Sequence, residues 1–255
     1  MLSRPNSSYL LGVALALFAA TGCQAQDNSV ETLQSDGNLQ PYQSHRAFNN
    51  IVIQYAVFLP EEFDTGRDYP TVLAFPAGAM GREDADDMTE RMWGTPASRG
   101  EWIVVVPLVP GEDWRTHPNH HALNDLLDHI KDHYPVRDDK FHIMGYGRMG
   151  SDIASTWSNM SGDYFSSLTT ASGAPYRTWD EGDLEHLPTD EGARLDLLIV
   201  LGEEDETTTV DTEEAKVRLD GVGYPYTFEI IEGDDVALES LSNGGLLQLM
   251  ASRLL

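Results

Sequence analysis

The sequence predicts a doubly wound α/β fold, with a mostly parallel sheet and helices on both of its faces. Short apolar segments rich in β-branched residues recur along the chain, and amphipathic segments with helical periodicity alternate with them. One apolar segment runs directly into a glycine-bracketed turn that opens another helical pattern. Strands that alternate with such helices need crossover connections, which join parallel strands. The 255 residues, 41% of them hydrophobic, suffice for one large domain.

Residues 1–22 have the pattern of a secretion signal and are excluded from this domain. Arg4 precedes an apolar run at residues 9–20, which ends in small side chains. The only cysteine, Cys23, follows directly, so the segment resembles a bacterial lipoprotein signal whose thiol is diacylated. The alternative is an ordinary buried cysteine. Lipidation would anchor the protein in the cell envelope without a spanning helix, and Gln24 favours the outer membrane of a Gram-negative cell.

Residues 23–45 are polar and rich in Gln, Ser, Asn and Gly, which is typical of a flexible tether. We therefore expect the folded domain to occupy residues 46–255. The formal net charge of −26 makes nucleic acid a poor partner. Such an acid-rich surface indicates either adaptation to a saline habitat or simply a well-solvated face, and composition does not separate the two. A single cysteine excludes an internal disulfide.

Strands are predicted where apolar runs stop at Pro, Gly or polar turns. The run 102–109 is the most β-branched, so we expect a central strand that is buried on both faces. The other predicted strands are residues 51–59, 71–75, 141–145, 165–173, 195–202 and 226–231.

Helices are predicted from apolar residues at spacings of three and four. In residues 82–93, several acids stand near the positive end of the helix dipole, where they stabilise the helix. Leu123, Leu126, Leu127 and Ile130 mark a second helix, which ends before Pro135. Further helices are predicted after the glycine-bracketed turn, at 212–219 with a closing Gly221, and at 246–254.

The segment Phe141–Ser151, which reads F-H-I-M-G-Y-G-R-M-G-S, is the motif around which these elements are organised. The run Gly145–Gly150 resembles the Gly-x-Ser-x-Gly elbow of the α/β-hydrolases, a strand-turn-helix turn that lifts a nucleophile above the sheet. The nucleophile position holds Gly147, which has no side chain to attack with.

From about Tyr55 to the carboxyl end, the order of elements is similar to the α/β-hydrolase fold, especially secreted esterases of the polyhydroxyalkanoate-depolymerase and feruloyl-esterase type. Residues 162–165 stand where that family often has Pro-x-x-Phe, and residues 170–175 follow in the expected place. Leu201–Asp205 match the Leu-Gly-x-x-Asp pattern that ends in the triad acid of the family. The resemblance implies an α/β-hydrolase fold for the domain.

Ester hydrolysis in this family needs a hydroxyl nucleophile, a histidine base and a carboxylate that orients the histidine. The resemblance implies that the acid position is Asp205 and that the base position lies near Asp235 and Val236. No histidine follows His186, and an aspartate replaces imidazole at neutral pH only if its pKa is strongly raised. We therefore expect a degenerate triad, in which Asp205 is a solvated acid at a strand end.

Other side chains near the elbow are candidates for the missing parts of the esterase site. Ser151 is an alternative nucleophile, but it lies one helical turn beyond the apex. The oxyanion-hole positions of the family match Ala79, in the loop after residues 71–75, and Arg148, next to Gly147. Arg148 either faces the vacant pocket and binds an anion or forms a salt bridge with one of the 42 acids.

A histidine-rich loop supplies the one candidate metal site. His117, His120 and His121, with Asp113 nearby, follow the strand at 102–109, and histidines with an acid can bind zinc. The spacing matches no established ligand pattern, so a polar loop leading into a helix is the favoured interpretation. No metal or other cofactor is expected.

These observations predict an anchored envelope protein of α/β-hydrolase fold whose esterase machinery has degenerated. The fold does not depend on the triad, because the sheet is held by buried apolar strands. We expect a binding or scaffolding role, with a small ligand or an envelope protein as the partner. The alternative is an active carboxylic-ester hydrolase with a non-standard or metal-assisted site.

Overall fold

The computed structural model describes residues 42–78, 81–93, 102–108, 117–188, 190, 194–232, 246, 249–250 and 252. The strands are β1 (Gln43–Arg46), β2 (Val52–Phe58), β3 (Tyr69–Phe75), β4 (Ile103–Leu108), β5 (Val136–Tyr146), β6 (Phe165–Ala171), β7 (Asp196–Gly202) and β8 (Thr227–Ile231).

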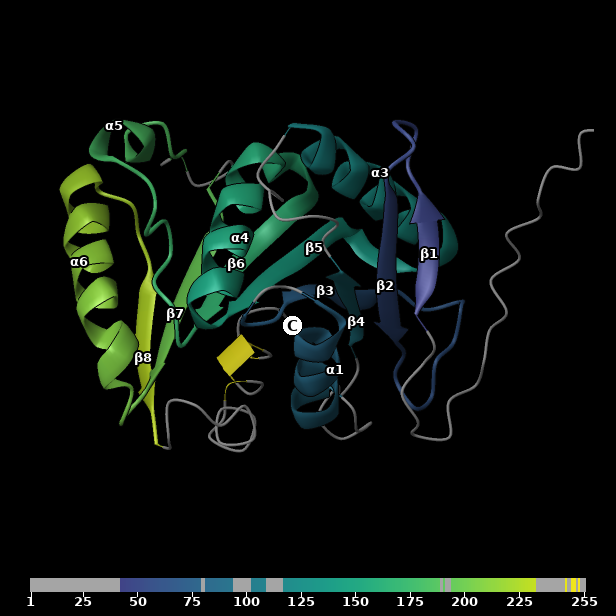
Figure 1. The fold of residues 1–255 in the computed structure, drawn as a ribbon, viewed down its shortest axis with the longest axis horizontal. Coiled ribbons are helices and arrows are strands. Elements are labelled where there is room, and N and C mark those ends of the chain that lie inside the picture. Colours follow the sequence, from purple (N-terminus) through teal and green to yellow (C-terminus); the bar gives the residue numbers. More distant parts are fainter. Residues whose placement is uncertain are drawn as a thin grey trace, which may run out of the picture. The chain divides into compact units, whose positions relative to one another are not determined.

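These strands form one sheet in the order β1-β2-β4-β3-β5-β6-β7-β8 (Figure 1). β2 pairs antiparallel with β1 and β4, whereas every pair from β4 to β8 is parallel. The mostly parallel sheet expected from the sequence is therefore confirmed, and β4 is a buried inner strand as predicted.

The helices alternate with the strands along the chain. They are α1 (Arg82–Met88), the π-helical turn η1 (Thr89–Trp93), α3 (His117–His133), α4 (Gly147–Met160), the 3-10 turn η2 (Gly162–Tyr164), α5 (Glu181–Leu184) and α6 (Glu206–Val222). Among the described residues, no helix is both long and apolar enough to cross a bilayer.

Alternation along the strands divides the core between the two faces of the sheet. In β3, Val72 and Ala74 pack in one cluster with Met88 of α1. Phe75 points to the opposite face, where its ring meets that of Trp157 from α4 edge-on, with centroids 5.2 Å apart. Helices therefore cover both faces, and the parallel strands between them are buried on both sides.

The side of α3 that faces β1 carries Asp125 and His129, one helical turn apart. Nε2 of His45 in β1 lies 2.9 Å from Oδ2 of Asp125, and the His45 ring stacks on the His129 ring with centroids 4.5 Å apart. The main-chain N–H of Phe48 donates to the same carboxylate oxygen at 3.1 Å. Burial, and then the nearby His133, lower the pKa of His129 to about 4.

The structure corrects two boundaries of the sequence analysis. Residues 43–45, assigned to the tether, are in β1, which pairs with β2 and so extends the sheet. The helix predicted at 212–219 begins at Glu206 and ends at a left-handed cap, Gly223, rather than at Gly221. Gly221 lies inside that helix, because the N–H of Gly223 closes the last turn on the Asp220 and Leu219 carbonyls.

Candidate functional site

The elbow predicted at Gly145–Gly150 is present at the carboxyl end of β5. Tyr146 ends the strand in an extended conformation, and α4 begins at Gly147. Gly147 has a φ of +63°, the left-handed conformation in which a side chain is strained. Gly150 allows close packing, since a Cβ there would lie 2.6 Å from the carbonyl oxygen of Phe75. The backbone therefore has the elbow geometry although its apex carries no nucleophile.

A side chain at the apex would meet the turn after β3. A Cβ placed on Gly147 would lie 2.8 Å from the Cβ of Ala77, closer than two carbon atoms normally approach. On another side, Gly173 packs so closely on the Gly147 carbonyl that a Cβ at Gly173 would collide with it. Ala77 belongs to the turn after β3, where the resemblance implied oxyanion donors. A side chain at residue 147 would need this turn to move.

Asp205 lies at the carboxyl end of β7, as predicted, but the expectation of a solvated acid is wrong. Asp205 is buried and is the N-cap of α6. One carboxylate oxygen accepts the main-chain N–H of Thr208 at 2.9 Å, and the other accepts the Thr208 hydroxyl. Both oxygens are thus used at the start of the helix, an arrangement that stabilises α6.

A chain of charged side chains joins α4 to α6 near the elbow. Nη2 of Arg148 lies 2.5 Å from Oδ2 of Asp211, and Nε of Arg177 lies 4.0 Å from the same oxygen. The Arg177 guanidinium also pairs with the buried Asp152 of α4. Of the two roles open for Arg148, the structure shows the salt bridge. Opposite charges alternate along this chain, so it is electrically balanced.

Ser151 is an unsuitable nucleophile in this arrangement. It is fully buried in the first turn of α4, and its hydroxyl donates to the carbonyl oxygen of Gly145 at 3.3 Å. Gly173 packs directly on the Ser151 hydroxyl. A substrate therefore has no approach to its oxygen.

The rings of His120 and His121 are neighbours, with centroids 5.5 Å apart, but each has a different further contact. Nε2 of His120 lies 2.5 Å from the hydroxyl of Ser161, whereas the His121 ring meets the Phe48 ring edge-on at 6.0 Å. In the part of the chain that the structure describes, no group of three or more histidine, cysteine, aspartate or glutamate side chains could hold a metal ion. His117 is the first residue of α3, but its side chain is not among those that the structure describes.

Several predicted positions lie outside the described residues. These are the lipidation site and the oxyanion-hole, base and loop positions: Cys23, Ala79, Asp113, Asp235 and Val236. For them the sequence expectations stand as predictions.

Three solved structures with a similar arrangement are distant in sequence from this chain. The chain superposes on a thermostable esterase with a TM-score of 0.57 at 17% identity, covering 84% of this chain and 62% of that one. It also superposes on a ferulic acid esterase (TM-score 0.56, 16% identity, 84% and 98% covered). An S-formylglutathione hydrolase from Agrobacterium tumefaciens gives a TM-score of 0.55 at 18% identity, with 84% and 94% covered.

The chain has the α/β-hydrolase fold. No protein-family model matches its sequence, and no curated protein matches it either. At identities this low, the likeness establishes the α/β-hydrolase fold alone, and activity has to be argued from the site.

The row of charged side chains that joins α4 to α6 was not predicted from the sequence. Asp152, Arg177 and Asp211 come from two helices and the turn between β6 and β7, and no spacing rule connects them. The capping role of Asp205 did leave a signal, because an aspartate directly before a helix is a typical N-cap.

Proposed function

We propose that this protein is a lipid-anchored envelope protein in which the α/β-hydrolase fold serves binding or scaffolding rather than ester hydrolysis. The observation that carries the proposal is the apex of the elbow, which has no nucleophile. Gly147 supplies no hydroxyl, and a Cβ at this position would lie 2.8 Å from the Cβ of Ala77. A binding protein keeps the apolar strands that build the sheet, while it has no need of an open position above the elbow.

The remaining parts of an esterase site support the same proposal. The carboxylate that would orient a histidine, Asp205, is used at both oxygens by Thr208. In this sequence no histidine follows His186, although the base follows the acid in chain order in this fold. For the anchor, the support is the apolar segment that ends directly before Cys23.

A fluorophosphonate probe tests the proposal, because it labels a serine only where the hydroxyl is activated. The full chain, purified in detergent, is expected to take up no label and to hydrolyse short-chain nitrophenyl esters no faster than buffer. A triple variant, Gly147→Ser with Ala77→Gly and Val236→His, restores a hydroxyl, the space for it and an imidazole. Labelling of the native chain at any serine would contradict the proposal.

One observation favours a second function, ester hydrolysis through a serine away from the elbow. Nε2 of His120 lies 2.5 Å from the Ser161 hydroxyl, which is the spacing of a nucleophile and its base. That hydroxyl donates to Oδ1 of Asn124 at 2.7 Å, so its proton is directed away from the imidazole. Mass spectrometry after treatment with the probe separates the two functions, since the second function predicts a label on Ser161 and the first predicts no label.

A further inference from the structure

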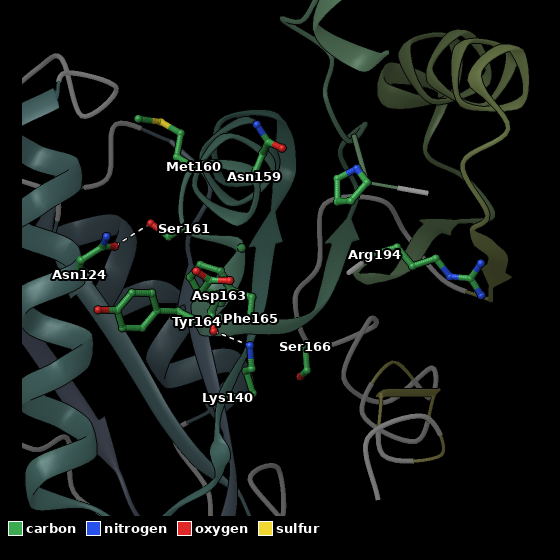
Figure 2. A pocket seen from close by; sticks show the side chains of 12 residues that line it. Asn124, Lys140, Asn159, Met160, Ser161, Asp163, Tyr164, Phe165, Ser166 and Arg194 are labelled. Carbon is green, nitrogen blue, oxygen red and sulfur yellow. Dashed lines mark hydrogen bonds between the residues drawn. The ribbon is translucent and has the colours of Figure 1, made fainter. Parts of the chain in front are cut away.

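A pocket of about 790 Å³ opens at the amino ends of the parallel strands, at the edge of the sheet opposite to the elbow (Figure 2). Lys140 reaches it from β5, Ser161 from the end of α4, and Arg194 from the segment before β7. A pocket of this volume accommodates a small organic ligand. None of the residues that line it belongs to the site predicted from the sequence.

Two cations line this pocket in a strongly acidic protein. The Lys140 ammonium donates to the main-chain oxygen of Asp163, a contact that leaves its charge unneutralised. Arg194 forms no ion pair with any carboxylate in the described part of the chain. The one carboxylate that lines the pocket among the described residues is Asp163. Neither cation forms an ion pair within the described residues, although Asp163 lines the pocket and Asp128 accepts a hydrogen bond from the Tyr164 hydroxyl of the same lining.

The lining also contains two serine hydroxyls that contact neighbouring side chains. The Ser161 hydroxyl is fixed between His120 and Asn124. The Ser166 hydroxyl lies 3.0 Å from Nδ1 of His142, which stands behind the pocket wall. Burial lowers the pKa of His142 to about 4, so this ring is neutral at pH 7, and the Ser166 hydroxyl also donates to the Phe141 carbonyl oxygen at 3.4 Å. Each hydroxyl can thus keep a fixed orientation toward a ligand.

Figure 2 shows how these groups are distributed around the pocket. Asn124 and Ser161 lie at one end of the view and Arg194 at the other, with Lys140 and Ser166 between them. Arg194 and Ser166 also line a second hollow of about 440 Å³ next to the first. Cations and hydroxyls therefore stand along one elongated ligand path rather than at a single point.

We propose that this amino-edge pocket binds a small polyhydroxylated organic anion, a sugar acid or a sugar phosphate. One of the two cations, Lys140 or Arg194, pairs with the anionic group, because charge-assisted hydrogen bonds are the strong ones. Ser161 and Ser166 exchange hydrogen bonds with ligand hydroxyls, which a simple inorganic ion does not have. The inference gives the proposed binding role a site and rests on that role, but it does not depend on the state of the elbow.

Calorimetric titration of the full chain in detergent tests the pocket with glucuronate, glucose 6-phosphate, neutral glucose and inorganic phosphate. At least one of the two sugar anions is expected to bind, and glucose and inorganic phosphate to bind at least tenfold more weakly. The double variant Lys140→Gln with Arg194→Gln should weaken anion binding at least tenfold. Whether glucuronate or glucose 6-phosphate binds more tightly identifies the anionic group.

A matched variant removes the same charges elsewhere. Arg91 and Lys216 pair with Asp87 and Glu213 on exposed helix faces, so Arg91→Gln with Lys216→Gln has the same net charge as the pocket variant. It should bind like the native chain. Equal losses in both variants, absence of binding by either sugar anion, or glucose binding as tightly as the anions would overturn the proposal.

The two proposals fail in different ways. Fluorophosphonate labelling of the native chain would contradict the proposed absence of ester hydrolysis, but it would not affect the calorimetric result. If the chain takes up no fluorophosphonate label and binds neither sugar anion, the proposed ligand of the pocket is wrong, and the proposal for the elbow still holds.

Discussion

Charged side chains are paired differently at the two edges of the sheet. At the carboxyl edge, Arg148, Asp211, Arg177 and Asp152 alternate in sign and neutralise one another around the elbow. At the amino edge, Lys140 and Arg194 form no ion pair within the described residues, although Asp163 lines the same pocket. A charge that already has a partner in the protein has little to offer a ligand, while an unneutralised one retains its capacity to bind. This difference in charge pairing is the reason why we propose ligand binding at the amino edge.

The largest effect should come from breaking the buried part of the charged chain. Arg177→Met leaves the carboxylate of Asp152, which is buried at the side of α4, without its cation. Removing one partner of a buried pair costs about 3 kcal/mol or more, measurable as the free energy of unfolding in urea. Arg148→Met, which removes an exposed cation of the same chain, should cost less than about 1 kcal/mol.

If both variants lose the same small amount, the chain is a set of surface pairs. Anion binding at the amino-edge pocket should be unchanged in either variant. A variant that loses both stability and anion binding would show that the two edges are not independent.

Acid should destabilise the domain through His142, whose ring lies behind the amino-edge pocket. The folded-state pKa of about 4 is lower than the unfolded value of about 6.5, so the stabilising contribution is complete above pH 6.5. It is lost as the pH falls from 6.5 to 4, by roughly 3 kcal/mol in total. Urea unfolding of the native chain and of His142→Gln at several pH values measures the difference.

The matched control for this titration is His186→Gln, because His186 is an exposed histidine. Its profile should follow that of the native chain. A His142→Gln profile as steep as the native one would place the acid sensitivity elsewhere, with His129 the next candidate since its pKa is also about 4.

A smaller effect is expected at the elbow itself. Gly147→Ala should cost about 2 kcal/mol, because a side chain is strained at positive φ and because its Cβ meets Ala77. Adding Ala77→Gly should recover the part that is due to contact and leave the part that is due to φ. A double-mutant cycle on the free energy of unfolding separates the two.

Additive losses in this cycle would mean that Ala77 does not obstruct a side chain at the apex. The carboxyl edge would then be open, and the contrast with the amino edge would rest on charge alone.

The sequence was sufficient for strands β2 to β8 and for the elbow because these follow from local patterns, whereas β1 was assigned to the tether. Apolar runs bounded by turn residues located the strands, and the glycines at 145, 147 and 150 located the turn after β5. The close approach of Ala77 to Gly147 was not predictable, since the two residues meet only when β3 and β5 lie side by side.

The amino-edge pocket was hidden for a similar reason. Lys140, Ser161 and Arg194 are separated along the chain and meet only because parallel strands begin at the same edge. Isolated basic and hydroxyl residues carry no motif, so no periodicity pointed to them. Asp205 shows the reverse case, in which a family pattern concealed a simpler signal, the N-cap of α6.

The attachment of β1 to α3 has a mechanical consequence. β1 is the first described strand after residue 42, and four residue pairs hold it to β2. Tension that enters the domain from its amino-terminal side reaches this short ladder before any strand of the core. The contacts of His45 and Phe48 with Asp125 spread that load onto a 17-residue helix. A pull on residue 42 would therefore act first on the pairing of β1 with β2 and on the contacts of β1 with α3.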